Sequence, residues 1–389
     1  MLRKAWRVLW VKFLNKTSKY LLVLLNALLM PLILLLAMVV RFSRNYRVVE
    51  RNGILLTGLD SLASKTIRRL NLYAIHMPVR VATYESKLNQ EYPKRIILKG
   101  LVLLDLFRTI RVIKKFGLHA IEIYMSGPLL YQVVLCWIFR RDLKLVVVLR
   151  GELYYYYTRM TFLERLAVQK IAKYSDLVLY RETYMRQIID KWNLETQLVF
   201  DPNSTEVKPL MSKTYSGEVL FLNGFKVWRN LEVLLRAVPI VASNFPSVKF
   251  TIIGARSEYE LSKYKAMVDK SCKSNVNLKM WSKNAARAYD DASIFILPAD
   301  LVYLNFSLLE AMERGLAPII SNVDDVEKII EDGNSGLIVK NRDSLALANA
   351  ICELLEDKDK LQQIGQAARQ VIINKFNDVD RVKNVVNYL

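Results

Sequence analysis

The chain has 389 residues, which is enough for two domains of about 150–200 residues each and some additional segments. Its formal net charge of +20 favours an anionic partner, such as nucleic acid, an anionic lipid surface or a phosphorylated substrate. The three cysteines, Cys136, Cys272 and Cys352, lie far apart, which excludes a disulfide framework and fits a reducing compartment. The two histidines are also isolated, so we expect no metal site.

Residues 1–50 have the composition of a membrane segment. Residues 1–19 place apolar side chains on one helical face and most basic side chains elsewhere, as in helices that lie in a membrane interface. Residues 20–40 are apolar except for Asn26 and Pro31, and about 20 such residues can span a bilayer. Basic residues flank both ends, so a crossing helix and a re-entrant helix kinked at Pro31 both stay open, as does a buried soluble helix. The long apolar run without a cleavage site argues against a signal peptide.

Residues 51–207 form a first predicted domain in which strands alternate with helices. This pattern predicts a parallel, doubly wound sheet. The predicted strands are 53–58, 79–84, 119–125, 143–149 and 176–180, and the predicted helices are 60–71, 96–116, 129–139, 162–173 and 183–191.

Residues 208–375 repeat the alternation after a linker at 208–216. The predicted strands are 218–222, 248–253, 276–280, 294–297, 317–320 and 336–339, and the predicted helices are 231–245, 259–272, 285–291, 307–314, 326–331, 344–355 and 358–375. Residues 376–389 form a tail that we expect to pack back on the first lobe as a helix. Two such lobes would face each other across a cleft, the usual place for a ligand.

The stretch from 294 to 320 reads as strand, loop, helix and strand. Ser307 suits the helix entry and Gly315 follows its end. The amino terminus of such a helix, at the carboxyl end of a parallel strand, suits a phosphate group. Glu310 has two interpretations: it binds sugar hydroxyls, or it is the capping-box acid of Ser307.

A second candidate site follows the first strand of the second domain. Gly224 would let the backbone approach a ligand, and Lys226 and Arg229 would clamp a diphosphate. The alternative is a solvated loop with two basic residues. Arg256 ends the next strand with a weaker signal of the same kind.

The first domain offers candidates on the acceptor side. Arg150 and Glu152 follow a predicted strand, where Arg150 would meet phosphate or substrate and Glu152 would orient an acceptor. Tyr154 begins a run of four tyrosines that would stack on a sugar or pack near a membrane. Gly58 and Asp60, after the first strand, are also assigned to the acceptor side.

Taken together, these motifs resemble the retaining GT-B glycosyltransferases of family 4. The matching residues are Gly224, Arg229-Asn230, Asn275-Val276, Ala292 to Pro298, Ser307 to Met312, Gly315, Pro318, Asp332 to Gly336, Ala368-Arg369, and, more weakly, Arg150-Gly151-Glu152 and Asp201-Pro202-Asn203. The resemblance implies an α/β GT-B-like fold of two doubly wound, Rossmann-like domains. It also implies a nucleotide-sugar donor bound without a metal and transfer with retention, without an enzymatic nucleophile.

The resemblance also assigns roles to residues. Lys226 and Arg229 would hold the diphosphate, and Glu310 the nucleotide ribose. The donor-binding segment would include Asn305, Ser307, Leu308 and Leu309. We also place Glu310, Arg150 and Glu152 in the catalytic set.

Several positions depart from the family pattern. The first of the two family glutamates falls on Val302, and Asp300 or Asn305 are the possible substitutes. Arg150 stands where the family often has histidine, and Phe225 where it usually has arginine. These departures motivate an alternative function: a catalytically silent GT-B subunit that scaffolds or activates a partner transferase.

The sequence therefore predicts a membrane-associated hexosyltransferase whose domains face the cytoplasm. The expected partners are a nucleotide sugar, a lipid-linked or membrane-proximal glycan acceptor and an anionic membrane surface. No cofactor is expected. A nucleic-acid partner is disfavoured because ten of the basic residues lie within the first 51 positions, beside the apolar segment.

Overall fold

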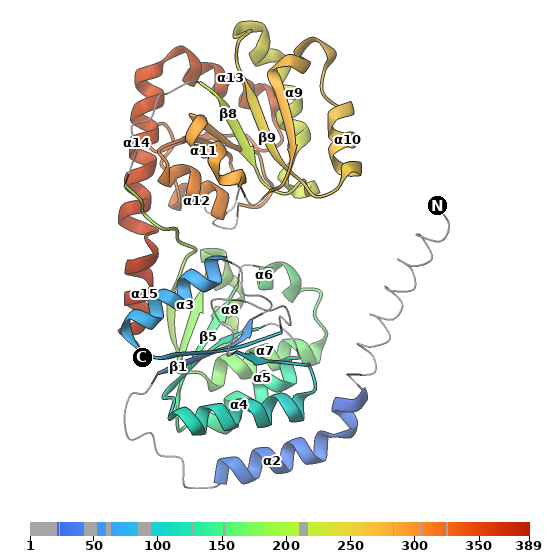
Figure 1. Cartoon of the computed structure of the whole chain (residues 1–389), viewed down its shortest axis with the longest axis vertical. Coiled ribbons are helices and arrows are strands. Elements are labelled where there is room, and N and C mark those ends of the chain that lie inside the picture. The colour runs from blue at the N-terminus through green and yellow to red at the C-terminus, as the bar shows by residue number, and fades with distance from the viewer. Residues whose placement is uncertain are drawn as a thin grey trace, which may run out of the picture. The chain divides into compact units, whose positions relative to one another are not determined.

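The structure is a computed structural model of the whole chain (Figure 1). It describes residues 22, 24–42, 53–59, 64–84, 95–125, 128–150, 152–209, 217–282, 284–302, 305–323 and 326–389. The chain divides into two compact units. The first contains residues 1–181, 185–201 and 382–389, and the second contains residues 182–184 and 202–381.

The first unit is built on a seven-stranded, all-parallel sheet with the order β3-β2-β1-β4-β5-β6-β7. Its strands are β1 (Ile54–Leu59), β2 (Val79–Thr83), β3 (Ile96–Ile97), β4 (Ala120–Tyr124), β5 (Lys144–Leu149), β6 (Leu177–Tyr180) and β7 (Gln197–Phe200). The chain order reverses beside β1, as in doubly wound folds, where ligands bind at the carboxyl ends of the strands. The apolar runs of β1, β4 and β5 are buried because helices cover both faces of such a sheet.

The helices of the first unit connect these strands, except for α2, which precedes β1. They are α2 (Met30–Phe42), α3 (Ser64–His76), α4 (Val102–Phe116), α5 (Leu129–Phe139), α6 (Glu152–Tyr157), α7 (Phe162–Tyr174) and α8 (Arg186–Ile189), the last flanked by 3-10 turns at Thr183–Met185 and Asp190–Trp192.

The helix predicted over 96–116 is wrong in its first turn. Ile96–Ile97 form the edge strand β3, and Gly100 has φ +81°, a left-handed conformation that interrupts a helix. The Asp105 carboxylate accepts hydrogen bonds from the backbone N–H groups of Lys99 and Gly100. The helix therefore begins only at Val102.

The second unit has a six-stranded parallel sheet with the order β10-β9-β8-β11-β12-β13. Its strands are β8 (Val219–Leu222), β9 (Phe250–Ala255), β10 (Val276–Met280), β11 (Ile294–Leu297), β12 (Ala317–Ser321) and β13 (Leu337–Val339). Because β8 pairs directly with β11, the loops that follow these two strands leave the sheet side by side.

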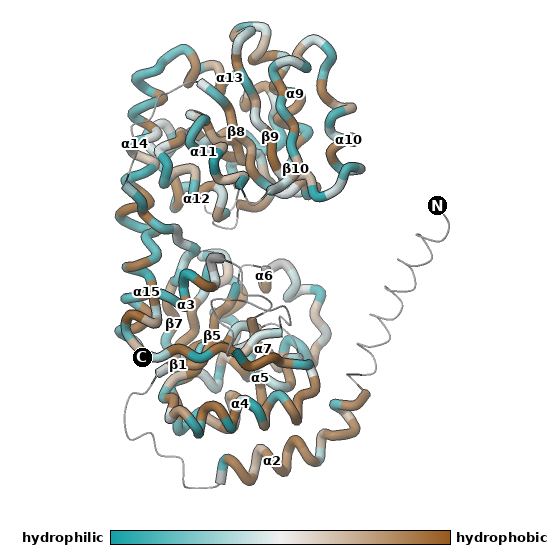
Figure 2. Tube along the Cα trace, in the orientation of Figure 1, coloured by the Kyte–Doolittle hydropathy of each residue, from teal (hydrophilic) through white to brown (hydrophobic). Residues whose placement is uncertain are grey.

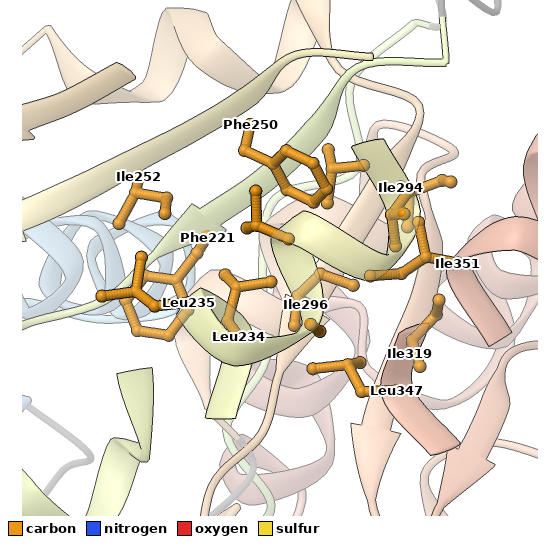
Figure 3. Close-up of a cluster of buried hydrophobic side chains, with 14 of the residues drawn as sticks. Phe221, Leu234, Leu235, Phe250, Ile252, Ile294, Ile296, Ile319, Leu347 and Ile351 are labelled. Carbon is orange, nitrogen blue, oxygen red and sulfur yellow. The ribbon is translucent and has the colours of Figure 1, made fainter. Parts of the chain in front are cut away.

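Helices pack on both faces of the second sheet. They are α9 (Leu231–Asn244), α10 (Glu258–Ala266), α11 (Ala288–Asp291), α12 (Phe306–Glu313), α13 (Ser344–Glu356) and α14 (Lys358–Lys375), with 3-10 turns at Val227–Arg229, Lys270–Asn275, Ala285–Arg287 and Val326–Lys328. The helix that follows them, α15 (Asp378–Val386), lies mostly in the first unit. One face of the sheet buries Phe221, Phe250 and Ile296 against helices α9 and α13, as Figure 3 shows. The other face packs on α12 and α14.

The last helix, α15, returns to the first unit. Val382 and Val385 are buried in the cluster that also contains Ile54 of β1 and Val146 of β5. Unit 1 thus includes residues from both ends of the sequence.

The N-terminal prediction is only partly within the described residues, because residues 1–21 and 43–52 lie outside them. Residues 24–28 and α2 are helical. In the part of the chain that the structure describes, no helix has the length and apolar character needed to cross a membrane.

Candidate functional site

The start of helix α12 differs from the prediction by two residues. Asn305, not Ser307, is the N-cap residue. Its Oδ1 accepts hydrogen bonds from the backbone N–H groups of Ser307, at 2.9 Å, and Leu308, at 3.2 Å. Asparagine is among the best N-cap residues, so the helix begins at Phe306. Two of the N–H groups expected to meet a phosphate are therefore occupied by a side chain of the same chain.

Glu310 is not a capping residue, because Ser307 does not cap this helix. The capping-box interpretation is therefore wrong. Instead, the Tyr289 hydroxyl donates to Glu310 Oε2 at 3.1 Å. Burial, followed by the nearby Glu310 charge, raises the pKa of Tyr289 well above its usual value, so this tyrosine stays a neutral donor. Tyr289 thereby positions the half-buried carboxylate in the second turn of α12.

An amide pair joins the ends of strand β8 and helix α12. Asn305 Nδ2 donates to Asn223 Oδ1 at 2.9 Å, and both side chains are buried. Asn223 Nδ2 is also buried and has no hydrogen-bond partner among the described residues. An unpaired buried donor is costly, so this atom is a candidate to meet a ligand oxygen.

Three glycines of the predicted sites have different surroundings: Gly58 lies in β1 of the first unit, and Gly224 and Gly254 lie in the second unit. A Cβ at Gly254 would lie 1.7 Å from the Asn223 carbonyl oxygen, and one at Gly58 would lie 1.9 Å from that of Tyr124. Both positions therefore require glycine for packing. A Cβ at Gly224 would meet nothing closer than Arg256 Nε, at 3.7 Å. The packing does not explain Gly224, which fits a close approach by a ligand.

Lys226 and Arg229, the predicted pair of diphosphate-binding residues, have different surroundings in the structure. The Arg229 guanidinium donates to the carbonyl of Leu301 at 2.9 Å, and so helps to hold the loop that follows β11. Lys226 is exposed, and its ammonium group lies 4.9 Å from the centre of the Trp228 ring. Arg256, from the end of β9, lies against Gly224 and is also exposed. Lys226 and Arg256 are thus the cations most open to an anion.

Asp300 belongs to the packing of the loop after β11. Its carboxylate accepts hydrogen bonds from Arg342, at 2.6 and 2.9 Å, from Asn230, at 2.7 Å, and from Asn341, at 3.1 Å. The hydrogen bonds from Arg342 contribute most to lowering the pKa of Asp300. Because these side chains occupy the carboxylate, Asp300 is a poor substitute for a missing glutamate.

Val302 is buried in the apolar cluster that contains Leu308 and Leu309. The position where the family has its first glutamate therefore lies in the hydrophobic core, and it carries no group that could bind a sugar. Asn305, the other possible substitute, uses its side chain for the cap and the amide pair.

An ion pair with helix α14, which the sequence did not suggest, fixes the carboxyl end of helix α12. The buried Glu313 carboxylate accepts from Arg369 of α14 at 3.0 Å, from the Lys208 N–H at 2.8 Å and from Arg314 at 3.0 Å. These bonds fix the carboxyl end of α12, and hence the placement of Glu310 three residues earlier.

The first-unit candidates are described only in part. Arg150 is exposed at the end of β5, and helix α6 begins at Glu152 and contains Tyr154, whose side chain lies outside the described residues, as does that of Glu152. Asp60 also lies outside them. These acceptor-side assignments stay predictions.

Sequence reasoning missed a buried ionic network in the first unit. Arg69 of α3 contacts Glu122 of β4 at 3.0 Å and Asp201 at 3.5 Å, and Arg181 contacts Asp201 at 3.2 Å. Tyr73 and Tyr124 both donate to Glu122. Burial raises the pKa of Asp201 despite the two arginines. Arg181 and Asp201 are the residues at which the chain leaves the first unit. The charges balance, so we assign the network to structure.

Residues 216–357 match the family described as glycosyl transferases group 1. Among solved structures, a HepE protein of Anabaena in complex with UDP is similar, with a TM-score of 0.72 and 13% identity over 87% of this chain and 99% of that chain. A glycosyltransferase of Rickettsia africae gives a TM-score of 0.68 at 13% identity, again over 87% of this chain and 98% of that chain. The chain therefore has a GT-B fold, and its residues 216–357 resemble the group 1 glycosyltransferases.

Two curated relatives are similar to part of the chain. A galactosyltransferase of Escherichia coli, named for UDP-Gal and α-D-GlcNAc-diphosphoundecaprenol, is 26% identical over 147 residues, or 38% of each chain. The phosphatidyl-myo-inositol mannosyltransferase of Mycolicibacterium smegmatis is 30% identical over 164 residues, or 39% of each chain. The alignments thus span less than half the length of these relatives.

Within the group 1 domain, the predicted donor residues come from neighbouring elements. Gly224 and Lys226 follow β8, and Ser307, Leu308, Leu309 and Glu310 lie on α12 after β11. Leu308 and Leu309 are fully buried, so only their backbone could face a ligand. Two residues deserve addition to the predicted set: Asn223, marked by its unpaired amide, and Tyr289, which orients Glu310. Neither has a signal in the sequence.

Proposed function

We propose that the protein is a glycosyltransferase that moves a hexose from a nucleotide diphosphate sugar to a lipid-linked or membrane-proximal glycan. The observation that carries the proposal is the junction of β8 and α12 in the group 1 domain. There a glycine that packing does not require, two exposed cations and a carboxylate held by Tyr289 adjoin a helix amino terminus. Such an arrangement suits a diphosphate and a ribose.

In this proposal the chain binds the donor with its own cations. Lys226 and Arg256 face the diphosphate, Asn223 Nδ2 donates to one of its oxygens, and Glu310 accepts from the ribose hydroxyls. No cofactor or metal is needed, and transfer retains the anomeric configuration. Arg150 and Glu152 act from the first unit, with Gly58, Asp60 and Tyr154 on the acceptor side. Retention and these roles rest on the family resemblance.

We further propose that the enzyme works at a membrane, with both units facing the cytoplasm. Support comes from the basic, apolar N-terminal segment, from the absence of a disulfide framework in the sequence, and from relatives named for undecaprenol-linked and phosphatidylinositol acceptors. The described end of this segment, α2, belongs to the first unit.

The first test is calorimetric binding of a panel of nucleotide sugars, followed by transfer assays with the hits. Lys226→Ala should weaken binding about tenfold by removing one exposed cation from the diphosphate site. Glu310→Gln should weaken it to a similar extent through the ribose. Lys265→Ala, an exposed lysine on α10, is the matched control and should leave affinity unchanged. Unchanged affinity in Lys226→Ala and Glu310→Gln would overturn the site.

A steric test addresses Gly224. Gly224→Ala should fold with an unchanged melting temperature, because its Cβ meets only the end of Arg256, and should weaken donor binding at least about tenfold. Full donor affinity in a folded Gly224→Ala protein would remove this glycine from the site.

The second candidate function is a silent GT-B subunit that activates a partner transferase. It is favoured by the buried Val302 and by the Asn305 side chain on the N–H groups of Ser307 and Leu308. The same calorimetry separates the two functions. The silent subunit binds no nucleotide sugar at millimolar concentration, whereas the enzyme binds at least one.

A further inference from the structure

Helix α2 and the helical residues before it have apolar side chains on every side. Between residues 24 and 40 the sequence contains one polar side chain, Asn26. A helix that is apolar all round is normally buried on all sides. Figure 2 shows α2 coloured as hydrophobic along most of its length.

One side of this segment is fixed to the first unit. Asn26 Nδ2 donates to the carbonyl of Gly100 at 2.9 Å, and its Oδ1 accepts from the N–H of Val102 at 2.9 Å. Further along, Ile33 and Ala37 are buried, and α2 packs against α5 and α4 (Figure 1). Asn26, Ile33 and Ala37 recur at helical spacing, so they define the inward face and fix the rotation of the helix.

The opposite side, here called the outward face, is exposed and wholly apolar. Leu28 is 68% exposed and Leu35 is 58% exposed. The other large exposed side chains of this face are Leu24, Leu25, Leu32, Leu34, Met38 and Val39. A contiguous apolar surface of this kind on a folded domain marks an interaction site.

Cationic side chains gather at the end of this helix. The Arg41 guanidinium stacks on the ring of Trp137 and donates to the backbone carbonyl oxygen of the same residue. Burial, and then the positive charges of Arg140 and Arg141, lower the pKa of Arg41, while Asp142 opposes this effect. Arg140 and Arg141 directly follow α5, the helix on which Arg41 packs, so cationic side chains at this end of α2 favour an anionic partner there.

We propose that α2 lies in the plane of an anionic phospholipid leaflet, with its outward face among the acyl chains and Arg140 and Arg141 at the lipid phosphates. The inference rests on the membrane association in the proposed function and specifies its mode. With Asn26, Ile33 and Ala37 packed on the first unit, lipid can reach only one side of α2, so this segment does not cross the bilayer.

A bilayer fits this surface better than a second protein does. Protein interfaces combine an apolar centre with a polar rim and about one hydrogen bond per 100–200 Å². The outward face offers no polar side chain between residues 24 and 40, since Asn26 is turned inward. Acyl chains require none, and the phosphates meet the charges that lie at one end.

The first experiment is co-sedimentation of the full chain with vesicles of phosphatidylglycerol and phosphatidylcholine. The variants Leu28→Glu, Leu32→Glu and Leu35→Glu place charge on the outward face, and each should lower the partition coefficient at least about tenfold. Leu345→Glu is the control, because Leu345 on α13 is also 58% exposed. Unchanged sedimentation of all three variants would overturn the proposal. It would also be overturned if the unaltered protein is a dimer in the absence of lipid and the three variants are monomers, because the outward face would then bind a second copy of the chain.

A second experiment tests the contribution of Arg140 and Arg141 to the binding of anionic lipid. The double variant Arg140→Ala, Arg141→Ala should lose about tenfold or more in binding to anionic vesicles and change little on phosphatidylcholine alone. Lys265→Ala in the second unit should bind like the unaltered protein. Equal losses on both vesicle types would show that the two arginines support the fold rather than meet lipid phosphates.

Measurements of how deeply residues of α2 enter the bilayer distinguish an in-plane helix from a crossing helix. Single cysteines at Leu24, Leu32 and Val39, in a chain with Cys352→Ser, carry a fluorophore quenched by brominated lipids. An in-plane helix gives the same shallow depth at all three positions, whereas a crossing helix gives graded depths and overturns the in-plane mode. Absence of vesicle binding would overturn the membrane association itself. Nucleotide-sugar binding, measured on the same variants in detergent, tests the transferase assignment independently.

Discussion

At the residue scale, Asp300 shows how an acid beside a candidate site can be fully used by its neighbours. Its carboxylate receives hydrogen bonds from Arg342, Asn230 and Asn341, which join the loop after β11 to the starts of α9 and α13. Two further bonds join the same loops: the Asp300 N–H donates to the Trp228 carbonyl, and Arg229 donates to the Leu301 carbonyl. The loop that carries the candidate site is thus held from several sides.

This arrangement predicts a pH-dependent contribution to stability. The pKa of Asp300 is lowered in the folded protein, mainly by hydrogen bonds from Arg342, so its ionised form favours folding above the unfolded pKa of about 4. That contribution is lost as pH falls from about 4 toward the lowered folded pKa. Asp300→Asn should lower the melting temperature at pH 7 by about 2–4 °C, with a smaller difference below pH 4. Thermal scans at several pH values measure this.

Asp359→Asn is the control for that measurement. Asp359 is exposed in the first turn of α14, so its substitution should change the melting temperature little at any of these pH values. A difference between Asp300→Asn and the unaltered protein that stays constant from pH 7 to pH 2 would contradict the account.

Several residue assignments could not be predicted from the sequence. Ser307 and Asn305 are both good N-cap residues two positions apart, and only the backbone conformation decides that Asn305 caps α12. The unpaired Nδ2 of Asn223 was recognised only from the structure, where the other side-chain atom, Oδ1, is bonded to Asn305, 82 residues later in the sequence. The missing glutamate at Val302 was visible from the resemblance, but its burial in the core was not.

At the element scale, the backbone N–H groups at the amino terminus of α12 can donate either to the Asn305 side chain or to a ligand. Asn305 Oδ1 occupies the N–H groups of Ser307 and Leu308, and a diphosphate oxygen would compete for the same donors. Asn305→Gly costs the helix only a few tenths of a kcal/mol, whereas Asn305→Ala costs about 1 kcal/mol. Both release the two donors.

We therefore expect both Asn305 variants to bind a nucleotide diphosphate about threefold or more tightly, as measured by calorimetry. Their melting temperatures should differ, with Asn305→Ala the lower, so affinity and helix stability are separated. If Asn305 instead binds the donor directly, as the resemblance implies, both variants bind more weakly.

Elements with strong local signals could be predicted from the sequence. The bounds of α5, β10, β11 and α14 agree with the prediction because continuous apolar runs or helical periodicity end at clear breaks. The strand β7 and the helix α6 were not predicted. Gln197–Phe200 is a short edge strand with exposed residues, and Glu152–Tyr157 contains four tyrosines, which have no helical pattern. The group 1 and GT-B assignments needed the combined motifs.

At the scale of the whole molecule, helix α15 links the end of the described chain to the first unit. Val385 is 2% exposed in the first-unit core, whereas Val379 on the same helix is 46% exposed. Val385→Asp should destabilise the first unit by about 3 kcal/mol or more, because it buries an unpaired charge among apolar side chains. Peptide-resolved hydrogen exchange should show faster exchange in β1 and β4.

Val379→Asp provides the matched comparison on α15 and should leave that exchange unchanged. Strands β8 and β9 of the second unit should exchange at the same rate in both variants. Equal acceleration of β1 and β8 in Val385→Asp would contradict the assignment of residues 382–389 to the first unit.

The return of residues 382–389 to the first unit has a consequence for biosynthesis. The ribosome completes residues 202–381, nearly the whole second unit, before it makes the two valines that close the first core. The unit that is translated first is therefore the one that finishes folding last. During translation of the second unit, the surface of the first unit that Val382 and Val385 later cover stays open, and chaperones have that interval in which to bind it.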